Sequence, residues 1–92
     1  MPSLQATQHD QILDHATKTA IQQAEEDYPR VFEQERLVEI ATAHAHLLMA
    51  ETKPEDGDAL IALYIGIFKA AYRLRRHALA ARPTGAAQHH SL

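Results

Sequence analysis

Apolar residues recur along most of this chain at the three- and four-residue spacing of an amphipathic helix. The first such segment begins after Thr7 and runs to about Asp27. The Thr7 hydroxyl can cap the first turn, with Asp10 three residues on in a capping-box-like spacing. The apolar side of this segment carries Ile12, Leu13, Ala16, Ala20, Ile21 and Ala24. Because half of these side chains are single methyl groups, we expect a weakly anchored helix that frays or exchanges between copies.

The second segment runs from about Pro29 to Glu51. Proline ends the preceding helix and can open the next one, because the first helical turn does not use the N–H that proline lacks. The apolar centre of this segment consists of Leu37, Val38, Ile40, Ala41, Ala45, Leu47 and Leu48. We therefore expect a long helix with one buried face.

The third segment opens with a helix-start signal, Thr52-Lys53-Pro54-Glu55. Thr52 is expected to cap this helix, the proline to occupy its first turn and Glu55 to reach back to the cap. Whether Gly57 lies in the first turn or in the loop before it stays open. The helix is expected to continue to about Ala81. Its apolar arc covers about 220° in helical projection, so it needs at least two neighbouring helices.

These segments predict an all-α fold, a small antiparallel bundle of two long helices plus a weaker N-terminal helix. The helical domain is expected to span residues 1–81, with residues 82–92 as a flexible C-terminal tail. A chain of 92 residues forms one domain with a thin core. Since the first helix offers little bulk, we expect a homodimer to complete the cover of the third. The alternative is a monomer in which the first two helices supply that cover.

Charge is divided unevenly between the two parts of the chain. Residues 1–58 hold all twelve acidic residues and four basic ones, a net charge of −8. Residues 59–92 hold five basic residues and no acid, so the total of −3 conceals a strongly dipolar molecule. Opposite charges in one small chain either pair with each other or present a surface to a partner.

Five residues of the basic part form a candidate partner-binding surface: Lys69, Tyr72, Arg73, Arg75 and Arg76. In an antiparallel hairpin this stretch lies opposite Glu33, Glu35 and Glu39, so one interpretation is an intramolecular charge match. A second interpretation is a surface for an acidic protein partner. A third is nucleic acid, because Tyr64, Phe68 and Tyr72 are interleaved with these basic residues, as in proteins that bind single strands.

Arg75 differs from its neighbours because it projects into the apolar arc, between Tyr64 and Phe68 in angle. A charge there is costly unless the long side chain reaches water or finds a partner. We expect the guanidinium to reach water near the helix end. If it does not, Arg75 is the residue expected to contact another chain.

Motifs for catalysis, cofactors and metals are missing from the sequence. The only serines are Ser3 and Ser91, and there is no cysteine and no glycine-rich phosphate loop, so we expect no enzyme and no cofactor. No two of the seven histidines are four residues apart, the spacing of a zinc helix, so we expect no metal site. His44 is expected to pack in the core with one ring nitrogen hydrogen-bonded, and the alternative is a pH-sensing role.

The sequence gives little support to membrane association. The N-terminus has neither the basic nor the apolar part of a secretory signal. The longest apolar run, Ala59–Phe68, has ten residues, about half of what spans a bilayer. Together with the absence of cysteine, these observations favour a cytoplasmic protein.

Together these patterns favour a small non-enzymatic helical protein of bacterial type. We expect it to be an adaptor, regulator or inhibitor that acts by stoichiometric protein–protein binding, with an unidentified and possibly acidic partner. The alternative is a nucleic-acid-binding accessory protein that uses the basic C-terminal half of the third helix. No motif in the chain identifies the partner.

Overall fold

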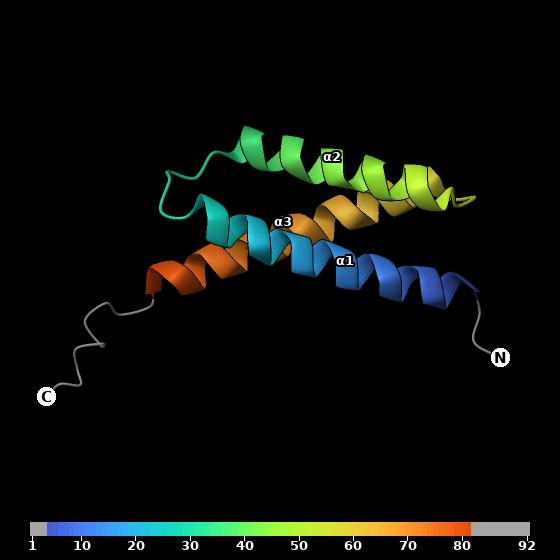
Figure 1. The fold of residues 1–92 in the computed structure, drawn as a ribbon, viewed down its shortest axis with the longest axis horizontal. Helices are drawn as coiled ribbons and strands as arrows, with labels where there is room; N and C mark the ends of the chain where they lie inside the picture. The colour runs from blue at the N-terminus through green and yellow to red at the C-terminus, as the bar shows by residue number, and fades with distance from the viewer. Residues whose placement is uncertain (1–3, 82–92) are drawn as a thin grey trace, which may run out of the picture.

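The computed structural model describes residues 4–81, with side chains from residue 9 onward. Three helices make up nearly all of this part of the chain: α1 (Leu4–Asp27), α2 (Gln34–Thr52) and α3 (Gly57–Ala81). The chain turns back at each connection, so that α2 returns along the path of α1 and α3 turns back once more (Figure 1). The predicted all-α fold is confirmed, and the third helix extends to Ala81, the last described residue, as predicted.

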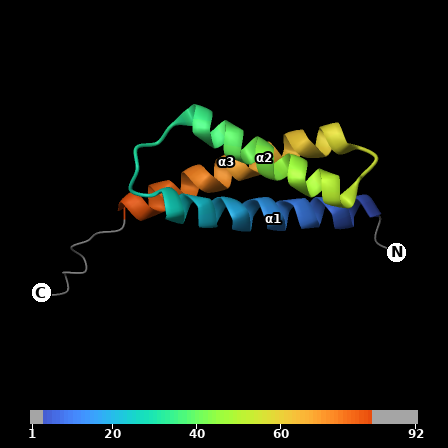
Figure 2. The same cartoon turned by 45° about the horizontal axis from the view of Figure 1, so that its top comes forward.

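Helix α3 is the centre of the fold. Both α1 and α2 pack against it, and the contact with α1 is the more extensive, whereas α1 and α2 touch each other little (Figure 2). An aromatic stripe at four-residue spacing, Tyr64, Phe68 and Tyr72, is buried along α3, with neighbouring rings stacked at centroid distances of 6.1 and 6.5 Å. This spacing places all three rings on one side of the helix, where they form the core.

Alanines let the two outer helices approach these rings. On α1, Ala16, Ala20 and Ala24 are fully buried, and so are Ala41 and Ala45 on α2. A methyl side chain leaves space for a neighbouring ring and allows the two backbones to lie close together. Small side chains opposite large ones therefore give α1 an extensive contact with α3, while the fraying or exchange of α1 stays a prediction.

Two helices begin at other residues than predicted. Helix α1 begins at Leu4, so Thr7 lies within it rather than capping it. Helix α2 begins at Gln34, not at Pro29. Residues 28–33 instead form a connection, which contains a cis peptide bond before Pro29. The connection runs over the end of α3, where the centroid of the Phe32 ring lies 6.3 Å from that of the Tyr72 ring. Residues 29–33, which were predicted to be helical, make this contact instead of a first turn of α2.

The predicted start signal of the third helix serves instead to end the second. Thr52 is the last residue of α2, and its hydroxyl donates a hydrogen bond to the Leu48 carbonyl at 2.9 Å. Lys53 follows in the left-handed conformation, with φ of 46°, and its N–H bonds to the Met49 carbonyl. Helix α3 begins only at Gly57, which answers the question that the sequence left open.

Within residues 4–81, none of the helices is both long enough and apolar enough to cross a membrane. The predicted flexible tail, residues 82–92, lies outside the described residues.

His44 of α2 lies on the aromatic stripe, with its ring stacked on that of Phe68 at 5.6 Å. Among the described residues its ring has no hydrogen bond, contrary to the prediction. The histidine that does form one is His15 of α1, whose Nδ1 is hydrogen-bonded to the Tyr64 hydroxyl at 2.7 Å. Burial, with a contribution from the nearby His15, lowers the pKa of His44 below its ordinary 6.5.

A pH-dependent stability follows from this lowered pKa. Between the lowered value and 6.5, the unfolded chain binds a proton at His44 more readily than the folded chain does, so acidification below 6.5 favours unfolding. We expect His44→Leu to flatten this fall in the free energy of unfolding, measured by urea titration at pH 7.5 and 5.5. The exposed His46 supplies the control, since His46→Leu should leave the fall unchanged. An identical fall in the wild type and His44→Leu would contradict this assignment.

Candidate functional site

An open pocket of about 280 Å³ lies where the α1–α2 connection crosses the end of α3. The connection contributes two aromatic residues, Tyr28 and Phe32, which remain 37% and 39% exposed. Helix α3 contributes its C-terminal half. We call this the aromatic–arginine pocket, and its lining residues are Tyr28, Phe32, Arg73, Arg76, His77 and Ala80.

The two arginines of the pocket are held against aromatic rings. The Arg76 guanidinium lies 5.9 Å from the ring centroid of Tyr28, 5.8 Å from that of Phe32 and 5.7 Å from that of Tyr72. Arg73 lies 6.0 Å from the Phe32 ring. Attraction between a cation and the face of an aromatic ring favours these positions and restricts the freedom of both side chains.

Neutral acceptors hold the same two guanidinium groups. Arg73 donates to the Gln34 side-chain oxygen, and Arg76 donates to the backbone carbonyl of Arg30 and, at 3.4 Å, to the Tyr72 hydroxyl. Among the described residues, neither arginine forms an ion pair with a carboxylate. Both positive charges are therefore fixed in position without being neutralised.

Two other arginines are neutralised, though not by the predicted acids. Arg36 of α2 pairs with Asp27 at 3.0 Å, and Arg75 of α3 pairs with Glu25 at 2.6 Å. No ion pair to Glu33, Glu35 or Glu39 occurs within the described part of the chain. The reason is that the acidic end of α1 lies beside the C-terminal half of α3, so α1 supplies the partner for Arg75.

Arg75 thus finds an acid in its own chain. Its side chain is 31% exposed, and its Nε atom is buried without a hydrogen-bond partner among the described residues. Lys69, which is partly buried, does not line the aromatic–arginine pocket. Of the five predicted residues, only Arg73 and Arg76 line it directly.

Asp27 holds this end of the bundle together. Its carboxylate is 5% exposed and accepts hydrogen bonds from the Tyr72 hydroxyl at 2.7 Å and from Arg36 and Gln23 at 3.0 Å each. Burial on its own would raise the pKa of Asp27, but these three donors outweigh it and lower the pKa. The ionised carboxylate therefore links α1 to α2 through Arg36 and to α3 through Tyr72.

Tyr72 is a support of the pocket rather than part of its open surface. It is 4% exposed, and burial together with the hydrogen bond to ionised Asp27 raises the pKa of its hydroxyl. The hydroxyl thus stays protonated and donates to Asp27, while one ring face lies near Arg76. The sequence identified Tyr72 but did not reveal this role.

Sequence reasoning missed the two aromatic residues of the connection and Asp27. Tyr28 and Phe32 flank a proline in a stretch that was predicted to enter a helix. Asp27 is the last of three consecutive acids, a pattern typical of a solvated helix face. The one available signal was a pair of large aromatic side chains close to a chain turn.

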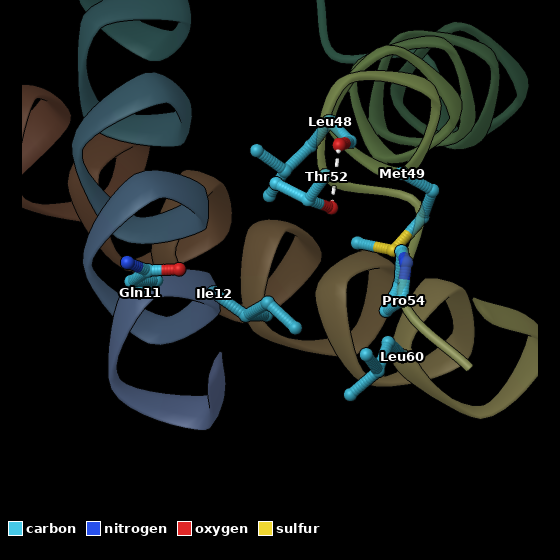
Figure 3. A pocket seen from close by; sticks show the side chains of 7 residues that line it. All are labelled: Gln11, Ile12, Leu48, Met49, Thr52, Pro54 and Leu60. Atoms are coloured by element: carbon cyan, nitrogen blue, oxygen red, sulfur yellow. Dashed lines mark hydrogen bonds between the residues drawn. The ribbon is translucent and has the colours of Figure 1, made fainter. Parts of the chain in front are cut away.

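A second cavity, of about 300 Å³, lies at the other end of the bundle between α1 and the α2–α3 connection. Figure 3 shows Ile12 projecting from α1 into the space bordered by Leu48 and Thr52 of α2. The Thr52 hydroxyl already bonds to the Leu48 carbonyl, and no lining residue is charged. This cavity has a mixed apolar and polar lining without a charged group, which gives no basis for recognising a ligand; its lining residues are Gln11, Ile12, Leu48, Met49, Thr52, Pro54 and Leu60.

Within residues 9–81, no three histidine, aspartate or glutamate side chains converge as ligands for a metal ion. The aromatic–arginine pocket brings positive charge and aromatic surface together around one volume. Comparisons of the chain with protein-family models, with curated proteins and with solved structures found no match.

Proposed function

We propose that this protein is a non-enzymatic helical interaction module, an adaptor, regulator or inhibitor that acts by stoichiometric binding to an acidic protein. The observation that supports the proposal is the pair Arg73 and Arg76, whose charges no carboxylate of the described chain neutralises. Aromatic rings and neutral acceptors hold both guanidiniums in place, so a partner carboxylate would meet donors that are already positioned.

The rest of the pocket suits an apolar residue of the same partner. Tyr28 and Phe32 present partly exposed rings beside a volume of about 280 Å³, enough for one large side chain. Tyrosine and arginine are enriched among the residues that dominate protein–protein binding energy. The proposed partner segment therefore carries one apolar anchor residue next to carboxylates.

Nucleic acid is the alternative ligand, because stacked aromatic and arginine side chains also suit single strands. Two observations favour an acidic protein over nucleic acid as the ligand. The aromatic stripe of α3 is buried rather than open to bases, and the chain as a whole has a net charge of −3. Binding to phosphates would weaken steeply with salt and lose slope with each arginine removed.

The assembly is part of the same proposal. We propose an antiparallel bundle completed by homodimerisation, because α3 keeps exposed apolar side chains, Leu63 at 38% and Leu74 at 70%, outside its contacts with α1 and α2. A cytoplasmic location fits the absence of cysteine from the chain.

The pocket is tested by removing its two charges. The tagged protein first captures its partner from nuclease-treated lysate of its host, and the purified partner is then titrated by calorimetry. We expect Arg73→Gln and Arg76→Gln each to weaken binding about 10- to 30-fold, as residues at the centre of an interface do.

Arg30→Gln is the matched control. It removes one nearby positive charge but keeps the backbone carbonyl that accepts from Arg76, so binding should change little. Equal affinity in the wild type and both pocket variants would refute the proposed site. Capture of nucleic acid alone, once nuclease is omitted, would favour the alternative.

A further inference from the structure

A shallow groove of about 280 Å³ lies between α1 and α3. Leu74 stands at its edge and is 70% exposed, the most exposed large apolar side chain of the three helices within the described part of the chain. A knob and a hollow thus lie side by side on one face. The groove is lined by Thr17, Ile21, Ala71, Leu74, Arg75 and Ala78.

Further apolar side chains continue this face along both helices. On α3, Leu63 and Ile67 lie eleven and seven residues before Leu74, spacings that keep all three on one side of the helix, and both are incompletely buried. On α1, Leu13 lies one turn before Thr17 and is 53% exposed. We call this surface the α1–α3 face.

The charged residues beside the groove are neutralised within the chain. Asp14 pairs with Lys18 at 3.2 Å, and Glu25 pairs with Arg75 at 2.6 Å. The exposed Asp10, which has no ion pair among the described residues, lies one turn before Leu13, at the far end of the face from Leu74. Two identical copies can therefore meet at the groove with little like-charge repulsion.

We propose that a second copy of this chain docks on the α1–α3 face, with Leu74 of each copy in the groove of the other. In a two-fold interface, if residue i of one copy contacts residue j of the other, then residue j of the first copy also contacts residue i of the second. A leucine beside a groove lined by alanine, threonine and isoleucine meets that requirement, because each copy offers both the knob and the hollow. This inference rests on the homodimer of the proposed function and assigns its interface.

The proposed dimer leaves the aromatic–arginine pocket open. In projection at 100° per residue, the α3 residues of the pocket and those of the groove are centred about 160° apart, on opposite sides of the helix. The dimer would present two such pockets, so a partner with two acidic segments would bind with higher avidity than either pocket provides.

The oligomeric mass tests the interface. We expect light scattering across a dilution series to show the wild type as a dimer at high concentration. Leu74→Glu should raise the dimer dissociation constant at least about 30-fold for each of its two contacts. Leu47→Glu is the matched control, since Leu47 is 64% exposed on α2, away from the face, and this variant should remain dimeric. Far-UV circular dichroism checks that every variant is helical.

A second pair of variants tests the arrangement itself. Ile21→Lys places a charge in the groove and should also give a monomer. When Ile21→Lys and Leu74→Glu chains are mixed, one contact brings the new glutamate to the new lysine and the other keeps the native leucine and isoleucine. Mixing should therefore restore a dimer.

A wild type that stays monomeric at all concentrations would overturn the proposal. So would a Leu74→Glu chain as dimeric as the control, or a mixture that stays monomeric. The Arg73→Gln, Arg76→Gln double variant should keep the dimer mass. A failed dimer would therefore be distinguishable from a failed pocket, because different residues carry the two.

Discussion

Replacing Asp27 with alanine is expected to lower the free energy of unfolding by about 3 kcal/mol, because it removes the buried carboxylate that accepts three hydrogen bonds. The change leaves the buried Tyr72 hydroxyl without its acceptor and removes the partner of Arg36. Arg36 is 41% exposed and can turn to water, which keeps the cost below that of a fully buried pair. Urea unfolding followed by circular dichroism measures the effect.

Asp14→Ala is the control for this prediction. Asp14 pairs with Lys18 four residues on, but both side chains are well exposed, so the expected cost is only about 0.5 kcal/mol. Equal losses in the two variants would mean that Asp27 contributes no more than an ordinary surface charge.

The acid dependence of stability provides a second readout of Asp27. Its folded pKa lies below the ordinary 3.8, so its stabilising contribution is complete above 3.8 and is lost as pH falls through the lowered value. Asp27→Asn should remove this part of the acid dependence. If the free energy of unfolding of Asp27→Asn fell at acid pH as much as that of the wild type, the assignment would be contradicted.

Truncating Phe68 to alanine should destabilise the protein by about 3–5 kcal/mol, as for other buried aromatic residues. Phe68 is fully buried at the centre of α3, and its ring stacks on Tyr64, Tyr72 and His44. A bundle of this size has a thin core, so such a loss is a large part of its total stability. Thermal and urea unfolding both measure it.

Phe32→Ala is the matched control for Phe68. It removes the same side chain from a position that is 39% exposed, at the rim of the pocket, and should cost about 1 kcal/mol. Comparable losses at both positions would contradict the prediction, because the connection would then stabilise the fold as much as the buried aromatic stripe does.

The sequence predicted the helices well where their stability comes from periodic burial. The wide apolar arc of the third helix predicted that it needs two neighbours, and the structure packs α1 and α2 against it. Helix starts were predicted less well, because local signals compete with tertiary contacts. Thr52 can cap a new helix or close the old one, and only the packing of α2 on α3 decides between them.

Of the aromatic–arginine pocket, the sequence predicted only residues that α3 contributes. Arg73 and Arg76 stood out as basic residues in a part of the chain without acids. Tyr28 and Phe32 join them through a connection that crosses the end of α3, and no local pattern encodes that crossing. The extent of the contact between α1 and α3 was not foreseen either, because the bulk of the α1 side chains was judged without the large side chains of α3 against which they pack.

The central helix is also the last of the three to be synthesised. Because α1 and α2 touch each other little and pack mainly on α3, the first two helices have almost no core to share until the residues around Tyr64 to Tyr72 have left the ribosome. An isolated helix of this length is at best marginally stable in water. Folding therefore awaits the last helix, and the buried alanines of α1 and α2 stay exposed on the nascent chain until α3 has formed.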